Sequence, residues 1–133
     1  MRCADSSLLV PALATWHEHH SPARNALRGI DTTVGHCLAE TYSVLTRLPE
    51  PLRGAPSETA ATIAGVVERV LLLDEADMRR APEVLAAAFV SGGATYDGLI
   101  ALTAIAYDAT LVTMDRRASR TYLALGADYE LVT

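Results

Sequence analysis

The sequence predicts an α/β protein in which a central parallel sheet is covered by helices on both faces. Short apolar or β-branched segments alternate along the chain with longer helical segments, which is typical of β-α-β units. Val70–Leu73 is a continuous apolar run bounded by charged residues, as in a strand buried on both faces. Two further short segments, Cys3–Ala4 and Thr110–Thr113, are each followed by an acid and then by a helical pattern. Together these observations favour a three-layer α/β/α sandwich.

The first half of the chain is predicted to hold two short strands and four helices. The first helix begins at Ser6 or Ser7, directly after the opening strand. Ser21 is the predicted N-cap of the second helix, because Pro22 then takes the first helical position. Pro49–Pro56 breaks the helical pattern and makes an exposed connection. The predicted helices span residues 6–14, 22–28, 36–48 and 57–69, and the second strand spans residues 32–34.

The second half repeats the alternation of strands and helices. After the strand at 70–73, a helix over residues 74–90 is expected to break at Pro82, and residues 91–95 form a loop. Gly98–Tyr107 is apolar nearly all round, which predicts a buried helix with Asp97 in its first turn. The last predicted elements are a strand at 110–113, a helix at 116–125 that Gly126 ends, and a strand at 129–132.

Length and composition indicate one globular domain over residues 1–133. Half of the residues are hydrophobic, yet no apolar run approaches the ~20 residues of a membrane span. The N-terminus has no signal-peptide pattern, because Asp5 interrupts it. Cys3 and Cys37 lie in apolar surroundings and match no zinc pattern, so we expect buried, reduced thiols in a cytoplasmic protein with no membrane contact.

The charge balance argues against a nucleic-acid binder that relies on a generally basic surface. The net charge is −5, and all 11 cationic residues are arginine. The acidic surplus is either scattered or concentrated in one site that a metal ion neutralises. If four of the 16 acids occupied such a site, the remaining 12 would nearly balance the 11 arginines.

Three histidines in four residues suggest a metal site at first sight. His17, His19 and His20 fall in the segment Trp16–His20, but no HExxH pattern is present and no further Cys or His follows nearby. We therefore expect these side chains to be solvated or to pack against the helices beside them.

Three acids are predicted to meet at one edge of the sheet. The carboxyl ends of parallel strands share an edge, and Asp5 and Asp115 follow two strands there, while Asp97 opens a helix on the same side. Each has a structural alternative: Asp5 and Asp115 can cap helices, and Asp97 can interact with a helix dipole for ~0.3–1 kcal/mol. Burying a carboxylate costs more than that unless it is paired or metal-bound. Converging acids therefore favour Mg²⁺ or Mn²⁺, which prefer oxygen ligands.

A fourth acid, Glu40, is ambiguous from its spacing alone. It lies at the edge of the apolar stripe of the helix at 36–48, where a carboxylate either points to water or leans toward a site. The spacing favours water, because a boundary carboxylate is normally exposed.

Four motifs stand out along the chain: D-S-S (Asp5–Ser7), L-A-E-T-Y-S-V-L-T-R-L-P (Leu38–Pro49), Y-D-G-L-I-A (Tyr96–Ala101) and L-V-T-M-D-R-R (Leu111–Arg117). In this order and at this spacing they resemble the PIN-domain nucleases, and most closely the VapC-type toxins of toxin–antitoxin pairs. The resemblance covers essentially the whole chain and implies that Glu40 joins Asp5, Asp97 and Asp115 as the catalytic, metal-binding acids. It also implies that Ser6 and Thr113 support them.

The resemblance further implies a fold, an activity and partners. These are a sheet of strand order 3-2-1-4-5, metal-dependent cleavage of RNA that inhibits translation or growth, a homodimer, and inhibition by a VapB-type antitoxin. The metal would be Mg²⁺, or alternatively Mn²⁺, and one or two ions would let a water attack the phosphodiester. We hypothesise that Pro49–Pro56 and the helices after it shape a groove for the antitoxin.

Other interpretations of the same residues remain open. Arg116 and Arg117 follow Asp115 and are candidates for RNA phosphate contact, or they form an ordinary solvated helix start. The chain could be a catalytically silent PIN-fold binding module. An Mg²⁺-dependent phosphotransfer domain is disfavoured. The families of this kind use a lysine in their site, and this chain has no lysine.

Overall fold

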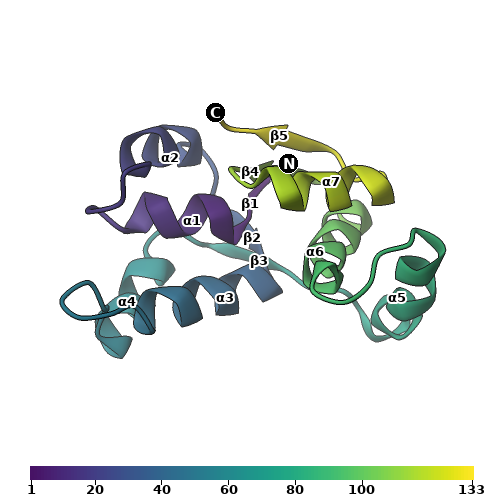
Figure 1. The fold of residues 1–133 in the computed structure, drawn as a ribbon, viewed down its shortest axis with the longest axis horizontal. Coiled ribbons are helices and arrows are strands. Elements are labelled where there is room, and N and C mark those ends of the chain that lie inside the picture. The colour runs from purple at the N-terminus through teal and green to yellow at the C-terminus, as the bar shows by residue number, and fades with distance from the viewer.

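The computed structural model describes residues 1–133 and contains one five-stranded sheet in which all strands are parallel. The strands are β1 (Arg2–Ala4), β2 (Thr32–Val34), β3 (Arg69–Leu71), β4 (Thr110–Thr113) and β5 (Tyr129–Leu131). Their order across the sheet is β3-β2-β1-β4-β5 (Figure 1). The predicted α/β class and strand order are therefore confirmed. Ala4 pairs with Val112, so the carboxyl ends of β1 and β4 lie side by side.

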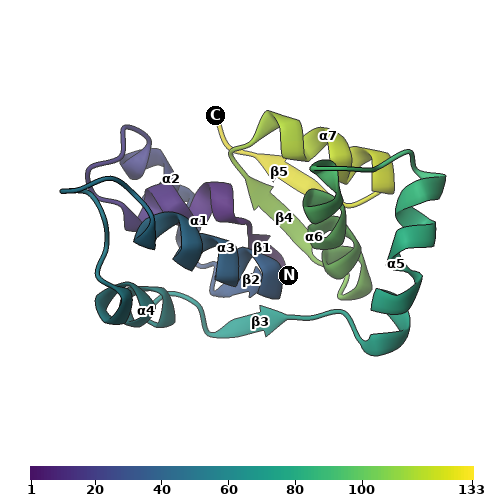
Figure 2. The ribbon, with the colours of Figure 1, turned by 60° about the horizontal axis from the view of Figure 1, so that its bottom comes forward.

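Seven helices connect the strands and cover both faces of the sheet. They are α1 (Ser6–Leu13), α2 (His20–Leu27), α3 (Gly35–Thr46), α4 (Pro56–Ala64), α5 (Glu75–Ala87), α6 (Ala94–Ala106) and α7 (Arg116–Leu125). α4 packs on α3 and α5 packs on α6, so both lie farther from the sheet. Figure 2 shows these two groups of helices at opposite ends of the molecule, joined by β3. None of the helices is long and apolar enough to cross a membrane.

Alternating side chains of the central strands supply two separate hydrophobic cores. In β1, Cys3 joins the core beneath α6 and α7, while Ala4 joins the core beneath α1 and α2. Leu111 and Val112 of β4 divide in the same way, as the twofold periodicity of a strand requires. Burying a side chain such as Leu111 stabilises the fold by about 1.5–3 kcal/mol. The two cores fix β1 and β4 in place, and the ends of these strands carry two of the candidate acids.

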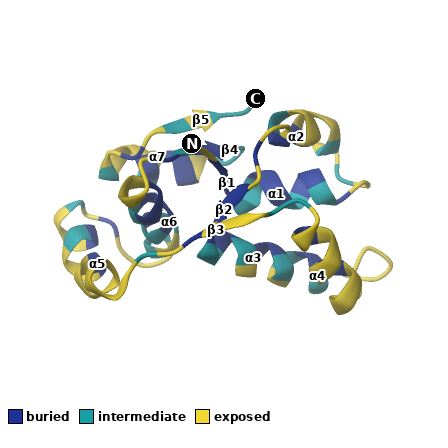
Figure 3. Cartoon of the chain, turned by 180° about the vertical axis from the view of Figure 1, so that it is seen from behind, coloured by how far each residue is buried: buried dark blue, intermediate teal, exposed yellow.

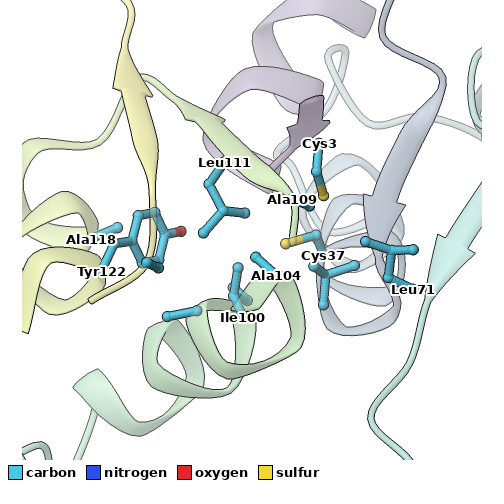
Figure 4. Close-up of a cluster of buried hydrophobic side chains, with 12 residues drawn as sticks. Cys3, Cys37, Leu71, Ile100, Ala104, Ala109, Leu111, Ala118 and Tyr122 are labelled. Carbon is cyan, nitrogen blue, oxygen red and sulfur yellow. The ribbon is translucent and has the colours of Figure 1, made fainter. Parts of the chain in front are cut away.

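The core under α6 and α7 contains both cysteines and one buried tyrosine. Cys3 and Cys37 are free thiols and are fully buried, and burial raises the pKa of both. Figure 4 shows the ring of Tyr122 beside Leu111, with its hydroxyl directed away from α7 into the cluster. The expected burial of both cysteines is thus confirmed, and neither is in a disulfide.

The strand predicted to be buried on both faces is instead an exposed edge strand. Val70 is 39% exposed and Leu72, just after β3, is 63% exposed; Figure 3 shows most of β3 in the colour of exposed residues. β3 ends the sheet, and α4 and α5 pack on other helices rather than on it. A short apolar run does not by itself indicate whether neighbouring elements cover it.

Several predicted helix boundaries were wrong. The N-cap of α2 is His19 rather than Ser21. α4 begins at Pro56 and ends at Ala64, because the chain must turn at Gly65 to bring the backbone N–H groups of Glu68 and Arg69 to the carbonyl of Asp31.

Two predictions about the later helices were also wrong. α5 does not break at Pro82, which lies on the exposed side of one continuous helix. α6 begins at Ala94, inside the predicted loop, and it is not buried all round, because Ile105 is 44% exposed.

The histidine cluster has a structural role in this arrangement. The Nδ1 atom of His20 lies 2.8 Å from the carbonyl oxygen of Pro11, and the backbone N–H of His19 donates to Nδ1 of His17. No group of three or more histidine, cysteine or acidic side chains is close enough to hold a metal ion directly. His20 thus packs against α1, while the side chain of His19 is exposed to solvent.

Candidate active site

Asp5 lies at the junction of β1 and α1 and is only 2% exposed. It is itself the N-cap of α1: its Oδ1 accepts the backbone N–H of Leu8 at 3.3 Å and the hydroxyl of Ser7 at 2.6 Å. The capping alternative for Asp5 is therefore found in the structure, and the second carboxylate oxygen, Oδ2, takes no part in the cap.

Tyr122 of α7 holds the second oxygen of Asp5. Its hydroxyl donates to Oδ2 at 2.8 Å, and its side chain is 1% exposed. Burial, and then the charge of Asp5, raises the pKa of Tyr122 far above its ordinary value, so the hydroxyl stays protonated and donates. Sequence analysis did not identify this residue. A buried tyrosine must find a partner for its hydroxyl, but a separation of 117 residues gave no indication of which one.

A chain of hydrogen bonds links Asp5 to Asp115. Since Ser7 gives its only hydroxyl proton to Asp5, Thr113 must donate in the 3.1 Å contact between the Thr113 and Ser7 hydroxyls. Thr113 in turn accepts the backbone N–H of Asp115 at 3.1 Å, and Ser7 accepts that of Met114 at 2.8 Å. The predicted supporting residue Thr113 therefore joins the two strand ends, and Ser7 acts beside it.

Asp115 and Asp97 occupy the starts of α7 and α6. Asp115 caps α7, with its Oδ1 accepting the backbone N–H groups of Arg117 at 2.8 Å and Ala118 at 3.2 Å. Asp97 is half-buried in the first turn of α6 and accepts no hydrogen bond from another residue. Burial raises the pKa of Asp97 to about 6, and the charges of Asp115, Asp5 and Glu40 act in the same direction. The other three acids are thus close enough to repel it.

Glu40 reaches the site from α3. The hydroxyl of Ser6 donates to Oε1 of Glu40, and Nε2 of His36 lies 3.8 Å from Oε2. The side chain of Glu40 is still 41% exposed. Glu40 therefore lies at the border between the site and solvent, and Ser6, the second predicted supporting residue, connects it to the start of α1.

The four acids have no arginine partner. No arginine lies within ion-pair distance of Asp5, Glu40, Asp97 or Asp115, and the only basic side chain within 4.0 Å of any of them is His36, beside Glu40. No three of them are close enough together to hold one ion directly. Mg²⁺ commonly uses one or two carboxylates and keeps several waters. The hard oxygen donors and the unbalanced charge fit such a cation.

An open groove of about 630 Å³ lies beside Asp97 and Asp115. Arg117, one of the two predicted contact residues, lines it, whereas Arg116 is exposed and does not. Arg120 lines the groove as well, and sequence analysis missed it. It follows Arg117 by three residues and so lies on the same face of α7. This spacing in the sequence could have identified Arg120 as a second candidate for phosphate contact.

A family model for the PIN domain matches residues 2–123. The chain belongs to the PIN-domain family. It is 47% identical to Ribonuclease VapC40 of Mycobacterium tuberculosis over 135 aligned residues, with full coverage of both chains. This relative places it among the VapC-type members, and the resemblance noted from the four motifs is confirmed.

Solved structures share the fold at low sequence identity. VapC20 of Mycobacterium tuberculosis, described as a toxin that cleaves the sarcin–ricin loop, matches with a TM-score of 0.71 and 19% identity, covering 90% of this chain and 94% of that one. VapBC2 of Rickettsia felis, solved bound to a DNA fragment from its promoter, matches with a TM-score of 0.65 and 17% identity, covering 98% and 97%. At these identities the likeness concerns the fold.

Proposed function

We propose that this PIN-domain protein is a metal-dependent endoribonuclease that acts in the cytoplasm as the toxin of a toxin–antitoxin pair. The observation that carries the proposal is the group of four acids at the carboxyl edge of the sheet, which has no arginine partner. The 47% identity to a ribonuclease over the full chain supports the same activity. The proposal includes a divalent metal ion, a role for each acid and inhibition of growth.

The residues that would hold Mg²⁺ or Mn²⁺ differ in how many oxygen lone pairs they have free. Asp97 has both oxygens free, and Asp115 has Oδ2 free because its hydrogen bonds go to Oδ1. Glu40 accepts one hydrogen bond, from a hydroxyl, whereas Asp5 accepts two from hydroxyls and one from a backbone N–H; each retains further acceptor capacity. A bound divalent cation would supply Lewis-acid stabilisation of the phosphoryl oxygens and a lower pKa for water.

The side chains around the groove divide the remaining tasks. Ser7, Tyr122 and the backbone of Leu8 hold Asp5 in one orientation. Arg117 and Arg120 line the groove and suit the phosphates of RNA, since guanidinium groups bind phosphate through paired N–H donors. The acids would orient a water for in-line attack on phosphorus: the water oxygen forms the new P–O bond, the P–O bond to one ribose oxygen breaks, and that oxygen leaves as a hydroxyl with a proton from the water. The 2′-hydroxyl is then not the nucleophile, and no 2′,3′-cyclic phosphate forms.

The test is cleavage of structured RNA by the purified protein with Mg²⁺ or Mn²⁺, and with EDTA as the blank. We expect cleavage only with a divalent cation, products without a cyclic phosphate, and a loss of at least about 100-fold in rate for Asp97→Asn. Glu83→Gln, an exposed acid on α5, is the matched control and should keep the rate. If no RNA is cut with any divalent cation and expression leaves growth unchanged, the protein is a silent binding module.

A VapB-type antitoxin is the proposed inhibitor, and the structure offers two grooves near α4. One, of about 200 Å³, is lined by Leu52, Gly54 and Ala55 of the Pro-rich connection together with Trp16. The other, of about 470 Å³, lies between α3 and α4, and 8 of its 9 lining residues are hydrophobic. An amphipathic antitoxin helix suits such a groove. Full inhibition by the antitoxin after residues 50–55 are replaced by Gly and Ser would argue against a contact with this connection.

A homodimer is the proposed assembly. Apolar side chains of α5 and α6 meet at one cavity: Val84, Leu102 and Ile105 line it, and Ile105 is 44% exposed. A second copy of the chain would cover this surface. Light scattering on the purified protein should give about twice the 14.2 kDa mass of the chain, and Ile105→Glu should give the monomer mass. A wild-type protein that stays monomeric at all concentrations would contradict the assembly.

A further inference from the structure

A stacked pair of aromatic rings lies beside the acids and does not line the groove that contains the arginines. The rings of His36 in α3 and Tyr96 in α6 lie 5.2 Å apart, centroid to centroid, and are inclined by only 11°. Tyr96 is 55% exposed, and the side chain of His36 is 34% exposed. Each belongs to the site by position: His36 is one turn before Glu40 and 3.8 Å from its carboxylate, and Tyr96 directly precedes Asp97.

Neither ring is explained by the packing of the fold. Both lie outside the two hydrophobic cores, and the hydroxyl of Tyr96 makes no hydrogen bond to another residue. Tyr107, at the other end of α6, shows the contrast: it is similarly exposed, at 43%, but its hydroxyl donates to the carbonyl of Leu72 at 2.7 Å. Tyr96 thus presents a large apolar ring to solvent at the rim of the site.

Basic and aromatic side chains near the acids come from different pairs of helices. The groove with Arg117 and Arg120 is formed by α6 and α7, whereas the aromatic pair is formed by α3 and α6. Asp97 belongs to α6, the helix that contributes to both, and follows Tyr96 directly in the sequence. A phosphate approaching the aromatic side would meet Glu40 with no arginine nearby, but the flat face of a nucleobase carries no charge and would not be repelled.

We propose that Tyr96 and His36 form a stacking subsite for one unpaired base of the RNA next to the cleaved phosphodiester. Unpaired RNA bases are commonly recognised by stacking on aromatic side chains. The subsite rests on the proposed ribonuclease function and specifies its substrate: RNA with an unpaired base beside the cut. The phosphates then lie toward Arg117 and Arg120, and the base lies against Tyr96.

The first experiment compares steady-state cleavage of RNA containing a single abasic nucleotide on either side of the mapped cut. For the wild type, an abasic nucleotide at one of these positions should raise KM by about 10-fold or more while kcat changes little. Tyr96→Ala should raise KM of the intact RNA by a similar factor and make the protein insensitive to the abasic nucleotide. Tyr96→Phe keeps the ring and should behave as the wild type.

Tyr107→Ala is the matched control, because it removes an exposed ring about 16 Å away along the same helix. It should leave KM and the abasic sensitivity unchanged. His36→Ala is the second variant, which tests the pair if Tyr96→Ala folds poorly by circular dichroism. A fluorescent readout is independent of turnover: 2-aminopurine at the sensitive position should be quenched by the wild type and by Tyr96→Phe, but not by Tyr96→Ala.

The outcomes separate the subsite from the activity on which it rests. If the wild type cleaves no RNA, the proposed function fails. If it cleaves RNA but Tyr96→Ala keeps the wild-type KM and abasic sensitivity, the subsite alone is wrong. A variant that loses thermal stability or antitoxin binding with no change in RNA kinetics would show that the pair joins α3 to α6 or contacts the antitoxin instead.

Discussion

At the residue scale, the site depends on how Asp5 is held. One oxygen accepts two donors from the start of α1, and the other accepts the hydroxyl of Tyr122. The sequence indicated Asp5 through its place between an apolar segment and a helical pattern. It did not indicate Tyr122, because contacts between residues so far apart depend on how α7 packs on the sheet.

Tyr122→Phe removes one hydrogen bond from the buried carboxylate of Asp5 and leaves the ring in place. We expect the free energy of unfolding to fall by about 1.5–3 kcal/mol, as for a hydrogen bond to a charged group. Tyr129→Phe is the control, since Tyr129 lies edge-on to Tyr122 at 6.4 Å but donates no hydrogen bond to another residue. Urea denaturation measures both variants, and an equal, small loss in the two would show that Tyr122 contributes only packing.

The acids also predict a pH dependence of stability in the absence of metal. The pKa of Asp97 rises from 3.8 in a model peptide to about 6 in the folded protein, chiefly through burial and then through Asp115. The folded state therefore holds more protons than the unfolded chain between these pH values, and stability decreases as the pH rises from 4 toward about 6. Asp5, whose pKa burial also raises, acts in the same direction.

Thermal unfolding in EDTA at several pH values tests this dependence. The melting temperature of the wild type should fall between pH 4 and 6, and the fall should be smaller in Asp97→Asn because one of the titrating groups is gone. A melting temperature that rises through this range in both proteins would mean that the carboxylates are stabilised by partners other than a cation.

At the element scale, β1–α1 and β4–α7 are built on the same plan. Each strand ends at an acid that caps the next helix, and the Ser7–Thr113 contact joins the two units. The sequence predicted these two units well, because apolar segments followed by a helix-capping acid are local signals. The burial of β3 and the start of α6 were predicted wrongly. Both depend on which neighbouring elements cover the segment, and the local sequence does not contain that information.

Thr113→Val tests the link between the two units. It removes the hydroxyl that accepts the N–H of Asp115 and donates to Ser7, so we expect a loss of about 1–3 kcal/mol in the free energy of unfolding. Metal affinity should fall as well, by about 10–100-fold, as when outer-shell partners are removed.

Thr41→Val is the matched control for this substitution. Thr41 is fully buried on α3, and its hydroxyl has no hydrogen-bond partner. Replacing that hydroxyl with a methyl group should leave stability unchanged or raise it, because a buried unpaired polar group is unfavourable. Chemical denaturation of both variants gives the comparison. Equal destabilisation by the two substitutions would rule out a special role for the Thr113 hydroxyl.

At the scale of the whole molecule, the parallel sheet brings together acids that are far apart in the sequence. Asp5, Asp97 and Asp115 follow from local patterns and from the shared edge of the sheet. Glu40 does not, because its position on α3 is equally consistent with solvent, and only the family motif singled it out. The net charge of −5 is partly the consequence of this one site.

The most direct test of the central claim is the thermal stabilisation of the protein by Mn²⁺ at pH 7. An ion that binds only the folded state at 100 times its Kd stabilises it by about 2.7 kcal/mol. We expect a clear rise in melting temperature for the wild type and for Glu83→Gln, and a much smaller rise for Asp97→Asn and Asp5→Asn. Without metal, Asp97→Asn should be at least as stable as the wild type, because it removes a repelling charge and no hydrogen bond. Asp5→Asn should be less stable, because its amide nitrogen cannot accept the hydrogen bonds that both carboxylate oxygens of Asp5 accept. No Mn²⁺-induced rise in the wild type, or the same rise in all four proteins, would contradict a divalent metal site formed by these acids.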